Sequence, residues 1–241
     1  MLTLFPGFFQ GPLSESILKR AQERRIVEIV VHDFRVYARD RHATVDDRPY
    51  GGGPGMVLKP EPILEAVQSL SRGKGTHLIL LTPQGRPFRQ AVAKELVEHE
   101  HLVLVCGRYE GFDERIRECL SPDEISIGDY VLTGGELPAL VLLDATIRLI
   151  PGVLGDEDSS RYDSFTDAVL DFPQYTRPPI VQGIAVPEVL LSGDHERIRR
   201  WRRKEALRRT KLRRPDLLQQ AELSDEDRRL LREIEEEQGS C

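Results

Sequence analysis

The chain has 241 residues, of which 39% are apolar and 31% are charged, and its formal net charge is −6. This length allows one large domain or two smaller ones, and this composition excludes a disordered chain and a membrane protein. No apolar run reaches the roughly 18 residues that a bilayer span needs, and no basic segment precedes the first apolar residues as in a signal peptide. We therefore predict a folded, cytoplasmic protein.

The three cysteines, Cys106, Cys119 and Cys241, show neither CxxC spacing nor a nearby pair of histidines. An odd number of cysteines without that spacing argues against both a disulfide framework and a zinc site. The sequence predicts three free thiols.

Short runs rich in β-branched residues and leucine predict buried strands. They lie at Ile26–Val31, His77–Leu81, Leu102–Val105 and Glu124–Ile127. Segments with helical spacing lie between or after them, at Glu61–Leu70, Arg89–Glu98 and the strongly apolar Leu137–Ile150. Strands that alternate with helices predict an α/β domain with a mostly parallel sheet.

The composition changes after Gly155. Residues 156–161 (DEDSSR) are small and polar, and residues 171–179 (DFPQYTRPP) contain three prolines. This pattern predicts a flexible linker over residues 156–175. We therefore predict a first domain at 1–155 and a second, all-helical domain at 176–241.

Four glycine-rich segments follow predicted strands or join elements of the first domain. They are GGGPG at 51–55, GRYEG at 107–111, GDY at 128–130 and the pair Gly134–Gly135. Loops without side chains let backbone groups approach a ligand closely, and ligands of open α/β sheets bind beyond the carboxyl ends of strands. Three of these four loops, together with the TPQG segment at 82–85, are predicted to converge on one pocket, although glycines also serve simply to make turns.

None of these loops matches GxGxxG or GxxxxGK[ST], which argues against an ordinary dinucleotide or nucleoside triphosphate site.

A few ionisable residues stand out near these loops and in the predicted linker. Arg148, near the end of the apolar helix, needs an acceptor or an anionic ligand if it is buried, but the helix dipole also favours arginine there. Asp163, Asp167 and Asp171 lie in the predicted linker, where they serve either catalysis or the solvation of a loop. The residues alone leave both choices open.

The second half of the chain carries a strongly basic segment. Residues 197–214 hold eleven Lys or Arg and one Glu, a net charge of +10, whereas residues 222–237 hold eight acidic residues and three Arg, a net charge of −5. A basic helix with an embedded aromatic residue, Trp201, is typical of contact with a phosphate backbone. A membrane-surface helix is the alternative, but the apolar positions are too few for a broad lipid-binding face.

Six segments together resemble one known family, in that family's order. They are VDDRPYGGGPGM (Val45–Met56), LTPQGRPF (Leu81–Phe88), LVCGRYEGFDERI (Leu104–Ile116), SIGDYVLTGGELPA (Ser126–Ala139), IPGVLG (Ile150–Gly155) and YTRP (Tyr175–Pro178). With the basic RRWRRKEALRRT segment, the match covers nearly the whole chain. On these residues the sequence is identified as a member of the bacterial tRNA (guanine-N1)-methyltransferases, the TrmD family of the SPOUT superfamily.

The resemblance implies a fold that the pattern of elements does not reveal. Members of this family form a deep trefoil knot at the end of the first domain, which is an exception to the rule that chains do not knot. The knot loops bind S-adenosylmethionine in a bent shape, largely through backbone groups. The residues that match the cofactor positions are Leu81, Thr82, Pro83, Gly107, Tyr109, Glu110, Ile127, Gly128, Asp129, Tyr130, Val131, Leu132, Gly134 and Gly135.

The implied reaction transfers a methyl group to N1 of guanosine 37 of tRNA, next to the anticodon, when the preceding base is also G. N1 of the neutral base carries a proton, so a general base must remove it as N1 attacks the methyl carbon. Asp163 matches the proposed base of the family, and Arg148 matches an arginine that stabilises negative charge on O6. Glu110 matches a position that orients the substrate or binds Mg²⁺.

The resemblance also implies a homodimer, with the site between the knot of one subunit and the linker and C-terminal domain of the other. It makes Asp46 and Asp47, beside the glycine-rich loop, candidates for contact with the guanosine or the neighbouring subunit. In the basic helix, the charge pattern itself leads us to predict tRNA contacts at Arg199, Arg202 and Arg203.

Three departures from the family pattern occur. Gln174 stands where many members have His, which removes a candidate substrate contact, and Thr82 replaces the usual Ser but keeps the hydroxyl. The chain begins a few residues closer to LFP than is usual, which predicts a shortened first strand or reflects the choice of start codon. Two alternatives stay open: methylation of a ribose 2′-OH or an rRNA base, and a non-catalytic RNA-binding protein with a vestigial cofactor pocket.

Overall fold

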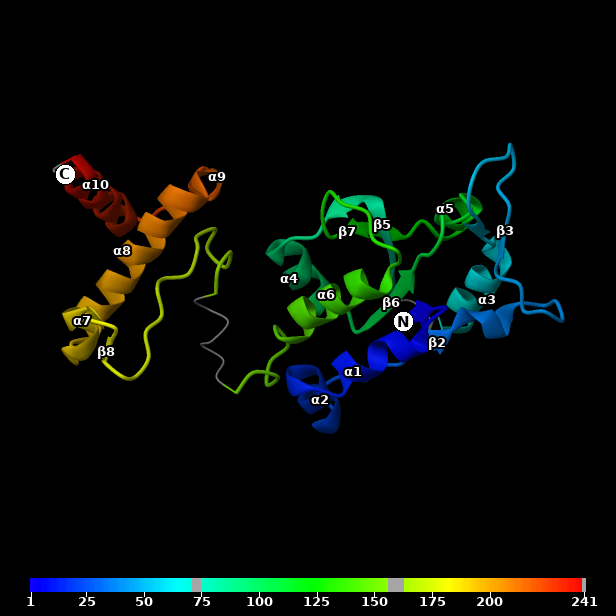
Figure 1. The fold of residues 1–241 in the computed structure, drawn as a ribbon, viewed down its shortest axis with the longest axis horizontal. Coiled ribbons are helices and arrows are strands. Elements are labelled where there is room, and N and C mark those ends of the chain that lie inside the picture. The colour runs from blue at the N-terminus through cyan, green and yellow to red at the C-terminus, as the bar shows by residue number, and fades with distance from the viewer. Residues whose placement is uncertain (71–74, 156–162, 240–241) are drawn as a thin grey trace. The chain divides into compact units, whose positions relative to one another are not determined.

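The structure is a computed structural model that describes residues 1–70, 75–155 and 163–239 (Figure 1). The chain divides into two compact units, Met1–Asp156 and Glu157–Cys241. The predicted polar segment at 156–161 and the predicted free thiol of Cys241 lie outside the described residues. Cys106 and Cys119 are free thiols, as predicted.

A five-stranded sheet forms the centre of the first unit. Its strand order is β2-β1-β6-β5-β7, and every neighbouring pair is parallel. The strands are β1 (Leu2–Thr3), β2 (His32–Asp33), β5 (Thr76–Pro87), β6 (His101–Cys106) and β7 (Asp123–Ser126). The predicted parallel α/β sheet is confirmed.

Three of the four predicted strands are present as β5, β6 and β7, but the predicted strand at Ile26–Val31 is wrong. The strand in this region is β2, because the two-residue β1 pairs on this side with His32 and Asp33 alone, while its other side pairs with β6. Before β2, the Met1 amino group donates a hydrogen bond to the Val30 carbonyl oxygen at 2.7 Å. Apolar character alone therefore misplaced the strand, since a strand also needs a partner along its length.

Helices cover both faces of this sheet (Figure 1). The 3₁₀ helix η2 (Phe34–Tyr37), α3 (Pro60–Leu70) and α5 (Arg115–Leu120) pack on one face. The other face carries η1 (Pro6–Phe9), α4 (Gln90–Val97) and α6 (Glu136–Ile147). Alternate residues of β6 serve the two cores: Val103 and Val105 lie in the first, Leu104 and Cys106 in the second.

The predicted helices are confirmed as α3, α4 and α6, although α6 ends at Ile147 rather than Ile150. Two short helices that the sequence did not predict, α1 (Gln10–Leu13) and α2 (Ser16–Glu23), precede β2.

A separate hairpin carries the first glycine-rich segment. Its strands, β3 (Asp46–Asp47) and β4 (Val57–Leu58), are antiparallel. Gly51, Gly52, Gly53 and Gly55 in the loop between them have φ angles of 83°, 78°, 130° and 78°. Side chains rarely adopt this backbone conformation, so the glycines are required by the path of the loop.

The second unit consists of helices and one small hairpin. The helices are α7 (Glu188–Leu191), α8 (His195–Arg213), α9 (Pro215–Leu218) and α10 (Asp225–Gly239), and the hairpin strands are β8 (Ile180–Val181) and β9 (Ile184–Ala185). The prediction of an all-helical second domain is therefore wrong at residues 180–185. Gln182 and Gly183 both have positive φ, 51° and 82°, as the two central residues of a type I′ hairpin turn do.

The described part of the predicted linker packs within the second unit. Val169 joins Leu207, Leu230 and Ile234 in its core. The Leu170 N–H donates to Thr210 Oγ1 on α8 at 2.9 Å. In the parts of the chain that the structure describes, no helix combines the length and apolar character needed to cross a membrane.

Candidate active site

A cavity of about 430 Å³ lies at the carboxyl ends of three neighbouring strands. Residues 81–84 interrupt the pairing of β5, residues 107–112 follow β6, and residues 126–135 follow β7, and all three segments contribute to its lining. Leu81 and Arg86 both pair with Ile125, so TPQG loops out of the strand between them. The predicted convergence of these loops is confirmed, whereas the GGGPG loop does not line the cavity.

All predicted cofactor-binding residues except Asp129 line this cavity, and Asp129 is exposed beside it. Gln84, Arg108 and Gly111, which belong to the predicted loops but were not predicted to bind the cofactor, also line it. The lining further includes residues that no sequence signal singled out: Phe112, Glu114, Arg117, Ile125, Ser126, Thr133 and Pro138. Arg117 and Pro138 lie on the helices α5 and α6, so no strand end marks them.

Glycines let two of the loops touch backbone to backbone. The Gly135 N–H donates to the Gly107 carbonyl oxygen at 2.9 Å. A Cβ on Gly135 would lie 2.6 Å from Cys106 Cα, and a Cβ on Gly134 would lie 2.3 Å from Arg108 Nε. Any side chain at these two positions would therefore push the loops apart.

A buried charge network supports the same loops. Glu136 is 1% exposed, accepts a hydrogen bond from Thr3 Oγ1 at 2.7 Å and forms an ion pair with Arg108 Nη2 at 2.8 Å. The atoms of this ion pair are not aligned as a hydrogen bond, so the contact is mainly electrostatic. The Arg108 guanidinium also lies 4.3 Å from the centre of the Phe5 ring. Glu136 thus links β1 to the two glycine loops.

Glu110 and the β3–β4 hairpin meet at the rim of the cavity. The Glu110 N–H donates to the Met56 carbonyl oxygen at 3.0 Å, and a Cβ on Gly55 would lie 2.2 Å from Glu110 Oε1. Burial, and then the charge and hydrogen bond of the Asp46 carboxylate, raise the pKa of Tyr109 above its ordinary value. The hairpin that contains the glycine-rich loop therefore borders the residues that line the cavity.

Two of the predicted catalytic residues, Arg148 and Asp163, are not among the residues that line this cavity. Arg148 is half-buried at the C-terminal cap of α6. Because α6 has 12 residues, its C-terminal end is about 18 Å from the end that borders the cavity. Asp163 belongs to the second unit, where its carbonyl oxygen accepts a hydrogen bond from the Thr166 N–H at 3.2 Å. One chain does not bring Arg148 to Glu110.

Comparison with known proteins identifies the family of this chain. The family model described as "tRNA (Guanine-1)-methyltransferase TrmD" matches residues 1–220. The chain belongs to this family.

Relatives named tRNA (guanine-N(1)-)-methyltransferase are similar over nearly the whole chain. One from Dehalococcoides mccartyi strain 195 is 58% identical over 236 residues, 97% of this chain and 95% of the relative. One from Geobacillus kaustophilus is 58% identical over 238 residues, 98% of each chain. One from Staphylococcus epidermidis is 56% identical over 230 residues, 95% of this chain and 94% of the relative.

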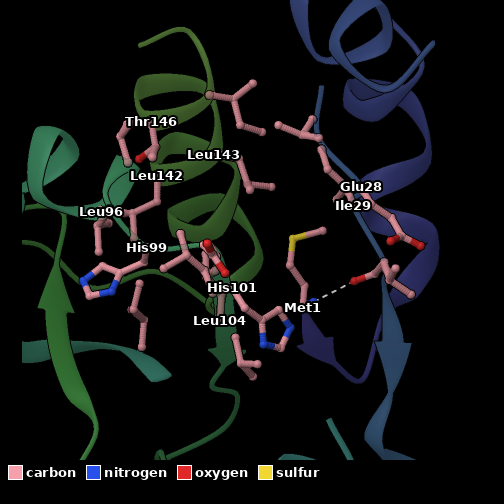
Figure 2. A pocket seen from close by; sticks show the side chains of 18 of the residues that line it. Met1, Glu28, Ile29, Leu96, His99, His101, Leu104, Leu142, Leu143 and Thr146 are labelled. Atoms are coloured by element: carbon pink, nitrogen blue, oxygen red, sulfur yellow. Dashed lines mark hydrogen bonds between the residues drawn. The ribbon is translucent and has the colours of Figure 1, made fainter. Parts of the chain in front are cut away.

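This TrmD-family chain has a second cavity, of about 660 Å³, at the amino ends of the strands. Figure 2 shows Met1, Leu142, Leu143 and Thr146 around it, with the Met1 amino group bonded to the backbone of the neighbouring segment. None of the predicted site residues lines this cavity. The cavity at the carboxyl ends is therefore the candidate active site.

The basic helix predicted to contact tRNA is α8, and much of its charge is already paired. Arg199 forms ion pairs with Glu196 at 2.7 Å and Glu226 at 2.9 Å. Arg203 donates to Asp227 at 2.6 and 3.0 Å. Arg202 instead lies with its guanidinium 4.9 Å from the centre of the Phe172 ring.

The predicted Mg²⁺ site near Glu110 has no supporting ligand cluster. Among the described residues, no group of three or more His, Cys, Asp or Glu side chains is placed to hold a metal ion. The role of Mg²⁺ stays a prediction.

Proposed function

We propose that this TrmD-family chain is a tRNA (guanine-N1)-methyltransferase that transfers a methyl group from S-adenosylmethionine to guanosine 37, next to the anticodon. The observation that carries the proposal is the glycine-lined cavity, which is built from the loops that match the cofactor positions of the family. The activity named for the relatives supports the same conclusion.

The residues of the cavity fit S-adenosylmethionine. Backbone groups of three loops line it, and Leu81, Ile127 and Leu132 offer apolar surface for an adenine ring. The lining holds two glutamates and two arginines, and Glu114 forms an ion pair with Arg117 at 2.9 Å, so Glu110 is the carboxylate that we expect to face the cationic sulfur. When bound, S-adenosylmethionine supplies an electrophilic methyl carbon attached to that sulfur.

The protein must then supply a base, a stabilising cation and an orienting group. In this proposal Asp163 accepts the N1 proton of the guanine, because neutral N1 has no lone pair available for attack. Arg148 stabilises the negative charge that develops on O6 as the proton leaves. Glu110 holds the base at the rim of the cavity, beside the Asp46 and Asp47 hairpin that we expect to face the tRNA or the partner.

A homodimer would complete this site, because Arg148 lies about 18 Å along α6 from the cavity of its own chain. α6 is mostly apolar, yet Leu137 and Val141 are 48% and 45% exposed, on a face that also carries the exposed Asp144. Phe5 and Phe8 are also exposed, and η1 contacts α6. These side chains support a self-complementary contact with a second copy.

The dimer can be tested by light scattering after gel filtration. We expect the wild type to be a dimer and the double variant Leu137→Glu, Val141→Glu to be an inactive monomer. Val36→Glu is the control, because Val36 is also apolar and is more exposed, at 77%, but lies on η2, on the other face of the sheet. A wild-type monomer with full activity would contradict the dimeric site.

The activity can be tested with tRNA transcripts that carry G or A at position 37, followed by mapping of the methyl group. We expect 1-methylguanosine with G37 and no product with A37. A 2′-O-methyl product would show that the alternative reaction is correct. If titration calorimetry shows no binding of S-adenosylmethionine, only the RNA-binding alternative is left.

The same proposal includes a trefoil knot in the loops around the cavity and tRNA contact along α8. Of the three α8 residues expected to contact tRNA, Arg202 alone has no carboxylate partner among the described residues. The cytoplasmic location agrees with a tRNA substrate and stays a prediction.

A further inference from the structure

A groove of about 770 Å³ in the second unit has no assigned role. We call it the Tyr175 groove. Its lining residues are Phe172, Pro173, Gln174, Tyr175, Thr176, Arg177, Pro178, Pro179, Val186, Leu190, Leu191, Ile198 and Arg202. The lining contains two arginines and no Asp or Glu, although the chain has 40 acidic residues. The groove therefore suits a partner that is both negatively charged and partly apolar.

The two arginines of the groove are not neutralised by carboxylates. Arg177 and Arg202 are exposed, and within the described ranges neither forms an ion pair. On the opposite side of α8 the situation differs, because Arg200 pairs with Glu233 and Lys211 pairs with Glu235 of α10. The acidic helix α10 thus leaves the cations on the groove side of α8 available.

A second arginine extends this side of α8. Arg209 follows Arg202 by seven residues, two helical turns, and so lies on the same face. Its Nη1 donates to the Asp171 carbonyl oxygen at 3.4 Å and makes no carboxylate pair among the described residues. The uncompensated charge therefore follows the segment at 171–175.

Aromatic rings lie beside these cations. Tyr175 is 48% exposed, and its ring centre is 6.3 Å from that of Trp201 at a tilt of 52°. Phe172 lies under the Arg202 guanidinium. Unstacked RNA bases bind to aromatic side chains and arginine planes, while their phosphates bind arginine charges.

We propose that the Tyr175 groove binds one unstacked nucleotide of the RNA substrate, next to the nucleotide that is modified. Its base lies against Tyr175 and the apolar wall, and its phosphate contacts Arg177 and Arg202. The position follows from the segment itself, because the Asp171 N–H donates to Ser164 Oγ at 2.9 Å and so ties the groove to the residue after Asp163. This inference rests on the proposed function.

The test measures tRNA affinity as a function of salt for Tyr175→Leu, Arg177→Gln and Arg202→Gln. We expect Tyr175→Leu to weaken binding by about 10-fold through lost stacking. Each arginine variant should lower the salt slope by about 0.9, the contribution of one phosphate contact. Tyr175→Phe keeps the ring and should keep the affinity.

Arg200→Gln and Lys211→Gln are the matched controls, because these cations lie on the same helix but are paired with α10. They should leave the salt slope unchanged. Trp201, the only tryptophan of the chain, gives a direct signal, because its fluorescence should change when tRNA fills the groove of the wild type but not that of Tyr175→Leu.

Thermal melting and S-adenosylmethionine affinity are measured for every variant, to show that each one folds. If the wild type methylates tRNA and the groove variants bind tRNA with the wild-type slope and affinity, this inference is wrong while the proposed function stands. If the wild type neither binds the cofactor nor methylates tRNA, the proposed function itself fails. If a groove variant changes only the oligomeric state of the protein in solution, and not its tRNA binding, the groove holds a second copy of the chain. That result would overturn the proposal that it binds a nucleotide.

Discussion

The cavity of the first unit and the basic helix of the second unit form their candidate binding surfaces differently, the first from backbone and the second from charged side chains. The cavity is built from backbone, and its glycines are needed where loops touch, as at Gly107 and Gly135. α8 relies on side-chain charge, and α10 neutralises much of that charge. A cluster of glycines in the sequence therefore indicates where the backbone must pack closely. A run of arginines does not indicate how many of them are free of carboxylate partners in the folded protein.

The difference has a direct consequence for the surface of α8 that we propose to contact RNA. Residues 197–214 have a net charge of +10, but Arg199, Arg203 and Lys204 pair with acidic residues of α10. An RNA would therefore meet fewer available cations than the net charge suggests, among them Arg202 and Arg209 on the side of α8 opposite Arg200 and Lys211.

The largest expected effect concerns Asp163, the proposed general base, in the second unit. Asp163→Asn should lower methyl transfer by about 1,000-fold, the size of a lost general base, because an amide cannot accept the N1 proton. Cofactor binding to the first unit should stay within about twofold, since the change removes no cavity wall. Single-turnover transfer and titration calorimetry measure the two quantities.

Asp167→Asn is the control for this variant, because Asp167 lies in the same segment, is exposed and only approaches Arg203 at 3.9 Å. It should transfer methyl groups at nearly the wild-type rate. Wild-type turnover by Asp163→Asn would show that another group removes the proton.

The next largest effect tests the backbone character of the cavity. Gly135→Ala should destabilise the loops by about 1–3 kcal/mol and weaken cofactor affinity, because the new Cβ meets backbone that cannot move aside. Gly7→Ala is the control, since a Cβ there meets nothing within 4 Å. Unchanged cofactor affinity in Gly135→Ala would mean that the loop contact does not shape the site.

A smaller effect tests the pairing between α8 and α10. Asp227 is 3% exposed and accepts two hydrogen bonds from Arg203, so Asp227→Asn should cost about 2 kcal/mol by weakening a charged hydrogen bond. Urea unfolding followed by Trp201 fluorescence measures this in the second unit. Asp225→Asn is the control, because its side chain is 92% exposed.

The same pair predicts a pH dependence. Burial raises the pKa of Asp227, but the hydrogen bonds from Arg203 and Ser224 outweigh it and hold the pKa below the ordinary 3.8. The stabilisation is therefore complete above pH 3.8 and is lost as the pH falls through the lower, folded-state pKa. Asp227→Asn should therefore reduce the loss of unfolding free energy as the pH falls below 3.8. An unchanged loss in this variant would show that other carboxylates cause it.

The smallest effect concerns an exposed pair. Glu226→Gln removes one of two partners of Arg199, so unfolding free energy should change by less than about 1 kcal/mol. The salt slope of tRNA binding should steepen by at most about 0.9, the value for one freed cation. A shallower slope would show that pairing with α10 does not withhold charge from RNA.

Much of the first unit could be predicted from the sequence, because its signals are local. Apolar runs correctly predicted β5, β6 and β7, and their carboxyl ends predicted where the glycine loops meet. Of the residues that the family motifs predicted to bind the cofactor, all except Asp129 line the cavity. The strand predicted at Ile26–Val31 failed because strand formation depends on a distant partner, the two-residue β1.

The site could be predicted only in part, since its remaining features depend on residues far apart in the chain. Arg148 and Glu110 are both family matches, yet α6 separates Arg148 from the cavity within one chain. The hairpin at 180–185 was also missed, because two-residue strands are too short to show a periodic pattern.

The sequence by itself determined the parallel α/β class, the glycine loops and the family, because hydrophobic period and backbone freedom are properties of neighbouring residues. Only the tertiary structure decided which charges are available. Arg203 and Asp227 are 24 residues apart, and their pairing exists only when α8 packs on α10. Electrostatic strength depends on distance and burial, which a linear count of charges does not contain.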